Sequence, residues 1–363
     1  MKIIGVVGTR PNFIKMAPVV SILKKHRGIA DTLLVHTGQH FDQSMSEIFF
    51  KELHLPEPDF HLGIGNFSPW KQSAQIVEKL GDIISKERPD CVIVPGDVNS
   101  TLASSIATIR SECKLAHLES GLRSFDRSMP EELNRIATDH LSDFLFVTEP
   151  SGLSNLKNEG IPASRVRFVG NTMIDTLLQS RILSRNSKIR SKLGLNEQPF
   201  ILMTMHRPGT VDNINGLQKL LEILVHAEKK GKVVFPIHPR TFKRLEEFKM
   251  INSFKQLSDL VLTEPLGYID FVALMDQARI VMTDSGGIQE ETTILETMCL
   301  TLRNNTERPI TCSTGTNKVV GTDPTTVITV LDECWEISPN CSIPEGWDGK
   351  AANRVVDYLL SKL

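Results

Sequence analysis

Three acidic positions in the first half of the chain lie where they could do proton chemistry. Asp97 comes shortly after the apolar run Cys91–Val94. Glu119 directly follows the apolar run Leu115–Leu118, and Glu131 follows a proline at the start of a predicted helix. Crowded carboxylates raise one another's pKa and suit proton transfer at carbon or oxygen. Helix capping and the helix dipole would also explain Asp97 and Glu131 taken singly.

A glycine turn with two cations follows the first predicted strand. Gly8 ends that strand, and Arg10 and Lys15 come next, at the start of a predicted helix. The N–H groups at a helix N-terminus can bind an anion. The segment lacks the GxGxxG pattern, which argues against a nicotinamide-dependent dehydrogenase. A tight turn with two surface cations is the alternative interpretation.

The second half carries histidines and a glycine-rich turn after its strands. His206 follows the strand predicted at Ile201–Met205, and His238 follows another strand. Either could hold phosphate or act as an acid, or cap a helix. Ser285-Gly286-Gly287 follows a further strand and opens a helix, so its N–H groups could cradle a diphosphate. Glu291, one turn into that helix, could accept both hydroxyls of a ribose, and Arg308 offers a second cation.

Two runs of alternating strands and helices must position these residues. The βαβα order predicts parallel sheets, and continuous apolar strands fit burial on both faces. We predict an α/β protein with two Rossmann-like doubly wound domains facing across a cleft, with ligand sites at the carboxyl ends of the strands. The predicted strands are Ile3–Val7, Thr32–His36, Cys91–Val94, Leu115–Leu118, Phe144–Val147, Ile201–Met205, Val233–Ile237, Val261–Thr263, Ile280–Thr283 and Cys299–Leu302.

The domain boundaries follow from the same pattern. We expect an N-terminal domain over 1–171 with the carboxylates and a C-terminal domain over 172–351 that binds the nucleotide. A helix over 352–363 is expected to pack back on the first domain. The polar stretch 180–199 is expected to be an exposed connection.

Composition limits the class of partner and the compartment. The chain has 363 residues and a net charge of −2, which gives no reason to expect nucleic acid or a membrane as partner. Its six cysteines form no CxxC pair or zinc spacing, so we expect free buried thiols in a reducing cytoplasm and no metal.

A set of motifs resembles one family. The chain contains, in order between residues 8 and 323, the segments GTRPNFIKMAP, HTGQH, PGDVNST, HLESGLRS, PEELNR, VGNTMID, HRP, HPR, TDSGGIQEE, NTERP and VGTD. They resemble the non-hydrolysing UDP-N-acetylglucosamine (UDP-GlcNAc) 2-epimerases over about nine-tenths of the chain. The GTRPNFIKMAP opening argues against the relatives that hydrolyse their substrate.

The resemblance implies a fold and a reaction. It implies a glycosyltransferase-B-like pair of domains, a homodimer, and no metal or nicotinamide cofactor. UDP would leave as the C2 proton is removed, giving 2-acetamidoglucal, and would add back after protonation of the opposite face to give UDP-N-acetylmannosamine (UDP-ManNAc). The product would supply surface polysaccharide synthesis.

The resemblance also implies roles for individual residues. The catalytic group would be Asp97, Glu119, Glu131 and His206. His206 would support the departing diphosphate, Asp97 and Glu131 would move protons at C2, and Glu119 would stabilise a cation-like sugar. Substrate contacts would come from Arg10, Lys15, Arg123, Arg135, His238, Phe271, Ser285, Gly286, Gly287, Glu291 and Arg308, with Phe271 near the uracil.

The chain departs from the family at a regulatory site. Gln39 and His40 match positions that bind an activating UDP-GlcNAc molecule, whereas Pro208 stands where many members have an arginine. A vestigial activator site is therefore expected.

Three other functions remain open on these residues. A UDP-2,3-diacetamido-glucuronate 2-epimerase would share every motif. A glycosyltransferase-B-type UDP-sugar transferase would share the diphosphate-binding half but would not need the three acids together. The same crowded acids argue against a non-catalytic nucleotide-sugar sensor.

Overall fold

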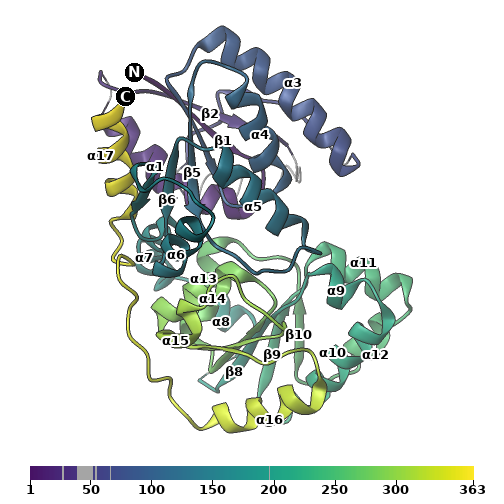
Figure 1. Cartoon of the computed structure of the whole chain (residues 1–363). Coiled ribbons are helices and arrows are strands. Elements are labelled where there is room, and N and C mark those ends of the chain that lie inside the picture. The colour runs from purple at the N-terminus through teal and green to yellow at the C-terminus, as the bar shows by residue number, and fades with distance from the viewer. Residues whose placement is uncertain (27, 39–51, 54, 66, 196) are drawn as a thin grey trace. The chain divides into compact units, whose positions relative to one another are not determined.

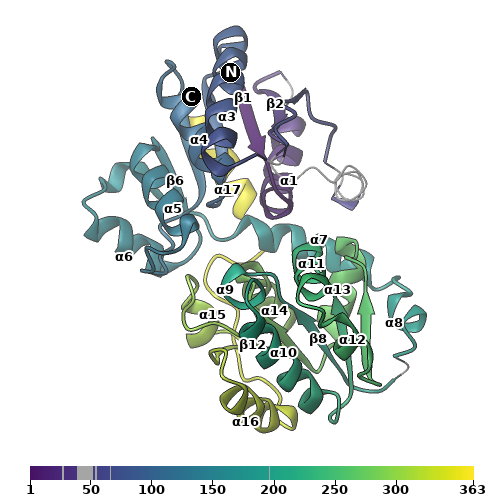
Figure 2. The same cartoon turned by 90° about the vertical axis from the view of Figure 1, so that its right-hand side faces the viewer.

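The chain folds into two compact units, shown in Figures 1 and 2. The computed structural model describes residues 1–26, 28–38, 52–53, 55–65, 67–195 and 197–363. The first unit comprises Met1–Leu178 and Glu345–Leu363, and the second comprises Gln179–Pro344. The predicted positions Gln39 and His40 lie outside the described residues.

The first unit is built on a parallel sheet. Among the described residues its strand order is β3-β2-β1-β4-β5-β6-β7. The order reverses between β1 and β4, and the crevice at such a reversal is where ligands bind in open α/β sheets. The strands are β1 Lys2–Val7, β2 Asp31–His36, β3 Phe60–His61, β4 Cys91–Pro95, β5 Lys114–Ser120, β6 Phe144–Val147 and β7 Val166–Phe168.

Helices cover the first sheet because each presents an apolar stripe. In α3, Ile76, Leu80 and Ile84 recur at helical spacing and are buried with Ala103 of α4 and the sheet residue Val92. Figure 2 shows α3 and α4 side by side. The helices of this unit are α1 Arg10–Lys25, α3 Pro69–Glu87, α4 Asn99–Ile109, α5 Pro130–Leu141, α6 Pro150–Asn158, η1 Ala163–Arg165, α17 Ala351–Lys362 and most of α7 Thr172–Ser184.

The second unit has a parallel sheet of the same type. Its described strand order is β10-β9-β8-β11-β12-β13, with the reversal between β8 and β11. The strands are β8 Phe200–Thr204, β9 Lys232–Pro236, β10 Leu260–Thr263, β11 Ile280–Thr283, β12 Met298–Thr301 and β13 Asn317–Val319. The helices are α8 Ile189–Lys192, α9 Pro208–Val211, α10 Ile214–Ala227, α11 Pro239–Glu247, α12 Ile251–Lys255, α13 Tyr268–Gln277, α14 Gly286–Leu295, α15 Ile310–Ser313 and α16 Pro324–Trp335.

The C-terminal helix α17 lies against α1, as Figure 1 shows. Asp175 of α7 accepts hydrogen bonds from the N–H groups of Ala351 (3.2 Å) and Ala352 (2.7 Å). A carboxylate from α7 thus satisfies the first N–H groups of α17, which have no partner within their own helix. Because of this tie, 172–178 and 345–351 belong with the first unit, whereas the sequence pattern placed them in the second.

The stretch 180–199, predicted as an exposed connection, is exposed or half-buried at most of its described residues. It contains helical structure, because α7 continues to Ser184 and α8 covers Ile189–Lys192. Ser180 and Ser184 are buried despite their polarity. Free thiols were predicted correctly, although Cys312 is exposed rather than buried. No helix among the described residues is long and apolar enough to span a membrane.

Asp175 predicts a pH-dependent contribution to stability. Burial raises the pKa of this carboxyl from 3.8 to about 6. Its contribution is therefore fully present below about pH 4 and is lost as the pH rises through about 6, a change of about 3 kcal/mol. The free energy of unfolding of the protein and of Asp175→Asn should be measured by urea unfolding from pH 4 to 7.5. As the pH rises, the stability of the protein should decrease relative to that of the variant.

Asp348 provides a control of opposite sign. A hydrogen bond from Arg354 lowers the pKa of Asp348, so its contribution is lost as the pH falls. As the pH rises, the free energy of unfolding of the protein should therefore increase relative to that of Asp348→Asn. A pH-independent difference for Asp175→Asn would contradict the assignment.

Candidate active site

The turn after β1 requires a glycine at residue 8. A Cβ there would lie 2.3 Å from Ser100 Oγ and 2.6 Å from Thr37 Oγ1. The N–H groups of Gly8 and Thr9 donate to Asn12 Oδ1 at 3.2 and 3.1 Å. The side chain of Asn12 therefore already occupies part of the anion site predicted here, and Arg10 is only partly buried.

Lys15 and Glu119 form a buried ion pair at the reversal point of the first sheet. Their side chains are 8% and 6% exposed, and Lys15 Nζ donates to Glu119 Oε2. Lys15, which was predicted to contact substrate, thus contacts a predicted catalytic carboxylate. A close cation favours the charged form of a buried carboxylate.

Glu119 has an unusual backbone conformation. Its φ is +71°, in the left-handed region, and the pairing of β5 with β6 shifts register between Leu118 and Ser120. Such conformations cost about 1–3 kcal/mol and concentrate at functional sites. Gly96 on the neighbouring turn has φ +66°, and a Cβ there would lie 3.2 Å from Glu119 Oε2. The two turns are thus packed directly together.

Asp97 is held by α5. Its carboxylate pairs with Arg135, whose guanidinium also pairs with Glu132, and both of these α5 side chains are buried. Asn134 Nδ2 donates to the Asp97 carbonyl oxygen at 2.9 Å. The predicted substrate contact Arg135 is therefore an ion-pair partner of a predicted catalytic acid.

The two adjacent glutamates of α5 have different environments. Glu132 accepts hydrogen bonds from the N–H groups of Ser124 (2.9 Å) and Phe125 (2.8 Å) and holds that loop. Glu131 is only half-buried. It lies four residues before Arg135, so both fall on one face of the helix. The structure thus brings Asp97, Glu119 and the first turn of α5 to one edge of the sheet.

Arg123 has a structural environment. Its side chain is 1% exposed and pairs with Asp139 and with Glu159, each at 2.7 Å. It was predicted to contact substrate. Because both sides of the guanidinium are engaged by carboxylates, its position is that of a buried structural cation.

In the second unit, His206 is oriented by Asp284. Its Nδ1 lies 2.9 Å from Asp284 Oδ1, and Asp284 Oδ2 accepts from the His206 N–H at 2.9 Å. Burial alone would raise the pKa of Asp284, but the His206 charge and these hydrogen bonds hold it below its usual value. The imidazole is 39% exposed and lies 5.4 Å from the ring of His238. His206 can therefore present Nε2 to a ligand.

The Ser285–Gly287 turn lies against Arg308. A Cβ at Gly286 would lie 2.3 Å from Arg308 Nη1, so only glycine allows this approach. Arg308 Nε is 3.0 Å from Glu290 Oε1. The Ser285 N–H already donates to Thr283 Oγ1 at 3.0 Å. The N-terminus of α14 and Arg308 together form the predicted diphosphate-binding feature, without the Ser285 N–H.

Glu291 is fixed by a tyrosine. Its Oε1 accepts from Tyr268 Oη at 2.6 Å, and the residue is 4% exposed. Phe271, predicted near the uracil, lies one turn further along the same helix α13 and is 7% exposed.

The sequence argument missed several residues that orient this site. Tyr268, Asp284, His117 and Asp139 all contact predicted site residues or the turns that carry them. The sequence did mark His117 and Asp284, because they lie within the family motifs HLESGLRS and TDSGGIQEE. Nothing local in the sequence marks Tyr268 or Asp139.

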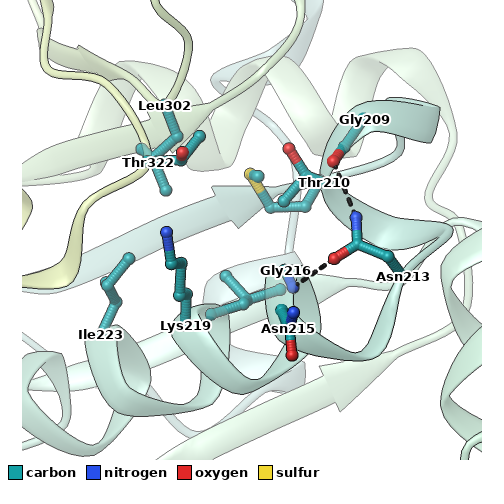
Figure 3. A pocket seen from close by; sticks show the side chains of 11 residues that line it. Gly209, Thr210, Asn213, Asn215, Gly216, Lys219, Ile223, Leu302 and Thr322 are labelled. Carbon is teal, nitrogen blue, oxygen red and sulfur yellow. Dashed lines mark hydrogen bonds between the residues drawn. The ribbon is translucent and has the colours of Figure 1, made fainter.

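A separate pocket of about 130 Å³ lies in the second unit. Figure 3 shows Lys219 and Asn213 beside it, and Met205 and Leu302 contribute apolar lining. None of the predicted site residues lines this pocket.

Comparison with known proteins agrees with the fold. The family model for UDP-N-acetylglucosamine 2-epimerase matches residues 23–360. A UDP-N-acetylglucosamine 2-epimerase of Methanococcus maripaludis is 39% identical, covering 99% of this chain and 98% of that protein. A UDP-2,3-diacetamido-2,3-dideoxy-D-glucuronate 2-epimerase of Pseudomonas aeruginosa is 34% identical, covering 99% of both chains.

A solved structure matches both units. The Methanocaldococcus jannaschii UDP-GlcNAc 2-epimerase, crystallised with UDP-GlcNAc and UDP, has a TM-score of 0.94 and 37% identity. The match covers 99% of this chain and 100% of that one. The fold and the match over nearly the whole chain are those of a nucleotide-sugar isomerase. The chain belongs to the UDP-N-acetylglucosamine 2-epimerase family.

The Lys15–Glu119 pair predicts strong energetic coupling. Lys15→Met removes the cation beside a buried carboxylate and should destabilise the protein by about 3–5 kcal/mol. The double variant Lys15→Met/Glu119→Gln should lose much less free energy of unfolding than the two single variants lose together, because it leaves no uncompensated buried charge. Urea unfolding of the four proteins gives the coupling energy.

The exposed pair Lys114–Asp143 is the control. Its side chains are 57% and 36% exposed at 2.9 Å, and its coupling should be below about 1 kcal/mol. If the losses of stability in the two single variants at Lys15 and Glu119 simply add up in the double variant, the predicted coupling is contradicted.

Proposed function

We propose that this protein converts UDP-GlcNAc to UDP-ManNAc by eliminating and re-adding UDP. The observation that carries the proposal is the strained Glu119, ion-paired with Lys15 beside the Asp97–Arg135 pair at the reversal of the first sheet. The activity for which the relatives are named and the UDP-GlcNAc in the Methanocaldococcus jannaschii complex support the choice of substrate.

The elimination step divides the work between two sets of residues. A carboxylate takes the C2 proton, the C1–O bond breaks, and the electron pair of the C–H bond forms the C1=C2 double bond of 2-acetamidoglucal. UDP leaves with the electrons of the C1–O bond, and His206, held by Asp284, supports the charge on the diphosphate. The N-terminus of α14 and Arg308 hold the diphosphate, while Glu291, fixed by Tyr268, accepts the ribose hydroxyls.

The return step delivers a proton to the other face of C2. We assign the two proton transfers to Asp97 and Glu131, because a single carboxylate cannot serve both faces of a planar carbon. The UDP oxygen then re-forms the bond to C1, and the fixed charge of Glu119 stabilises the cation-like sugar in both directions. The reaction is redox-neutral, so it calls for no nicotinamide cofactor.

A second candidate substrate has a specific observation in its favour. The Pseudomonas aeruginosa relative named for UDP-2,3-diacetamido-2,3-dideoxy-D-glucuronate is 34% identical over nearly the whole chain. The proposed chemistry at C2 would be unchanged, because the two substrates differ at C3 and C6. We further propose that the enzyme acts as a homodimer in the cytoplasm and supplies surface polysaccharide synthesis.

An isotope experiment tests the reaction directly. The protein incubated with UDP-GlcNAc in D2O should form UDP-ManNAc with deuterium at C2, followed by NMR, because the proton removed exchanges before return. Free N-acetylmannosamine as the end product would indicate hydrolysis instead. Turnover of the diacetamido-uronate alone would assign the second substrate.

Replacing Asp97 tests its assigned role. Asp97→Asn removes the proton acceptor while keeping the size of the side chain. The loss of transition-state stabilisation, measured from the decrease in kcat/KM, should be at least about 3 kcal/mol. Asp357→Asn, an exposed position on α17, is the matched control and should keep full activity. An active Asp97→Asn would remove this residue from the mechanism.

A further inference from the structure

His117 lies on β5 beneath the turns that carry the candidate acids, and it is completely buried. Its Nδ1 is 2.7 Å from Asp139 Oδ1, and its Nε2 is 2.7 Å from the carbonyl oxygen of Gly96. Gly96 is the residue directly before Asp97. The histidine therefore connects α5 to the turn that carries a proposed catalytic group.

The partners of His117 determine its protonation. A carbonyl oxygen can only accept, so Nε2 must carry a proton. On the other side, Asp139 Oδ2 accepts from the Gly121 N–H (3.0 Å) and from the Arg123 guanidinium (2.7 Å), and the charge of the guanidinium favours an ionised carboxylate. Since an ionised carboxylate can only accept, Nδ1 then also carries a proton. With both nitrogens donating, His117 is an imidazolium.

The charge on Asp139 agrees with this count. Burial by itself would raise the pKa of Asp139, but the hydrogen bond and charge of His117, followed by those of Arg123, hold it below its usual value. Arg123 in turn pairs with Glu159, which also lies 3.3 Å from His140 Nε2. Cations and anions therefore alternate along the contacts from His117 through Asp139 and Arg123 to Glu159, so the charge on His117 is compensated.

Asp139 also reaches the second acidic turn. Asp139 accepts a hydrogen bond from the N–H of Gly121, which lies two residues after Glu119. Gly121 has φ +82°, and Gly152 leaves no space for a Cβ on it. One carboxylate thus fixes both turns, through His117 to the Gly96 carbonyl and directly to Gly121. Glu131, Arg135 and Asp139 follow one another at intervals of four residues and so share one face of α5.

We propose that His117 and Asp139 are positioning residues for the proposed epimerisation, with His117 donating through both ring nitrogens and so fixing the Gly96–Asp97 turn relative to Glu119. Neither residue touches substrate. The inference rests on the proposed function for its kinetic consequence, but the protonation state of His117 can be measured without any turnover.

A neutral histidine is the competing interpretation. It would need a protonated Asp139 that donates to Nδ1, and the Arg123 guanidinium on Asp139 Oδ2 opposes this. A purely structural role is the other alternative, and it would change stability without changing kcat selectively. The two alternatives give different spectroscopic and kinetic results.

The first experiment is ¹⁵N NMR of the histidine rings of the protein without substrate, at neutral pH. Both His117 nitrogens should give protonated-type resonances, and His117→Gln assigns them by their loss. In Asp139→Asn the amide can donate to Nδ1, so that nitrogen should become nonprotonated while Nε2 keeps its proton. A nonprotonated His117 nitrogen in the unaltered protein at neutral pH would overturn the proposal.

The second experiment separates positioning from folding and binding. His117→Leu removes the donor to Gly96, and kcat should fall roughly tenfold to a hundredfold, the scale for a displaced catalytic group, with KM changed much less. His117→Gln keeps an N–H for that carbonyl and should recover most of the lost kcat. UDP affinity by calorimetry should be unchanged in both variants, because the proposed UDP-binding residues belong to the second unit.

A surface pair supplies the control. His226 and Asp332 also form a histidine–carboxylate pair, at 2.9 Å, but on the surface of the second unit, and His226→Gln should leave kcat unchanged. Equal kcat for His117→Leu and the unaltered protein would overturn the positioning role. An unaltered protein that fails to epimerise but shows the imidazolium would overturn the proposed function and leave the protonation state established.

Discussion

The candidate site depends on one constraint, which is that every buried charge at the strand ends needs a compensating charge. Lys15 and Glu119 are both more than nine-tenths buried, and each would be costly to bury alone. The pair spans β5 and α1, elements far apart in sequence. Its formation therefore requires the first sheet to be assembled, and it fixes Glu119 in the left-handed conformation that would otherwise relax.

The same constraint accounts for the face of α5 that lies on the sheet edge. Arg135 and Asp139 carry opposite charges four residues apart, and each finds its partner on a different strand turn. A helix that docks through charged contacts at fixed spacing has one register, because sliding by a turn would pair like charges. The turns that carry Asp97 and Glu119 are therefore held by the helix that also carries Glu131.

How much of this could be predicted from the sequence depends on the range of the interactions. Strands such as Ile280–Thr283 were predicted to the residue because a continuous apolar run fixes them locally. The edge strands β3, β7 and β13 were missed, because they have two or three residues and depend on their neighbours for pairing. Asp97 and Glu119 were found because each follows a strand in the sequence, and Glu131 because it follows a proline at the start of a helix.

The partners of those acids were less predictable. Arg123 and Arg135 were both expected to contact substrate, yet one pairs with Asp139 and Glu159 and the other with Asp97 and Glu132. A cation at a strand end looks the same in sequence whether it binds a ligand or a buried carboxylate. Only the fold, which brings residues tens of positions apart into contact, separates the two.

The second unit shows how a charge-compensated site can still attract a diphosphate. Near the N-terminus of α14, Arg207, Arg303 and Arg308 contact the two buried carboxylates of Glu290 and Glu307. Asp284, just before α14, is a third buried carboxylate at this place and accepts from the Arg207 N–H at 2.7 Å. The carboxylates hold the guanidiniums in place before a ligand arrives, and the helix dipole favours an anion at this end of α14. A diphosphate would thus meet a preorganised field and would not have to order three flexible side chains on binding.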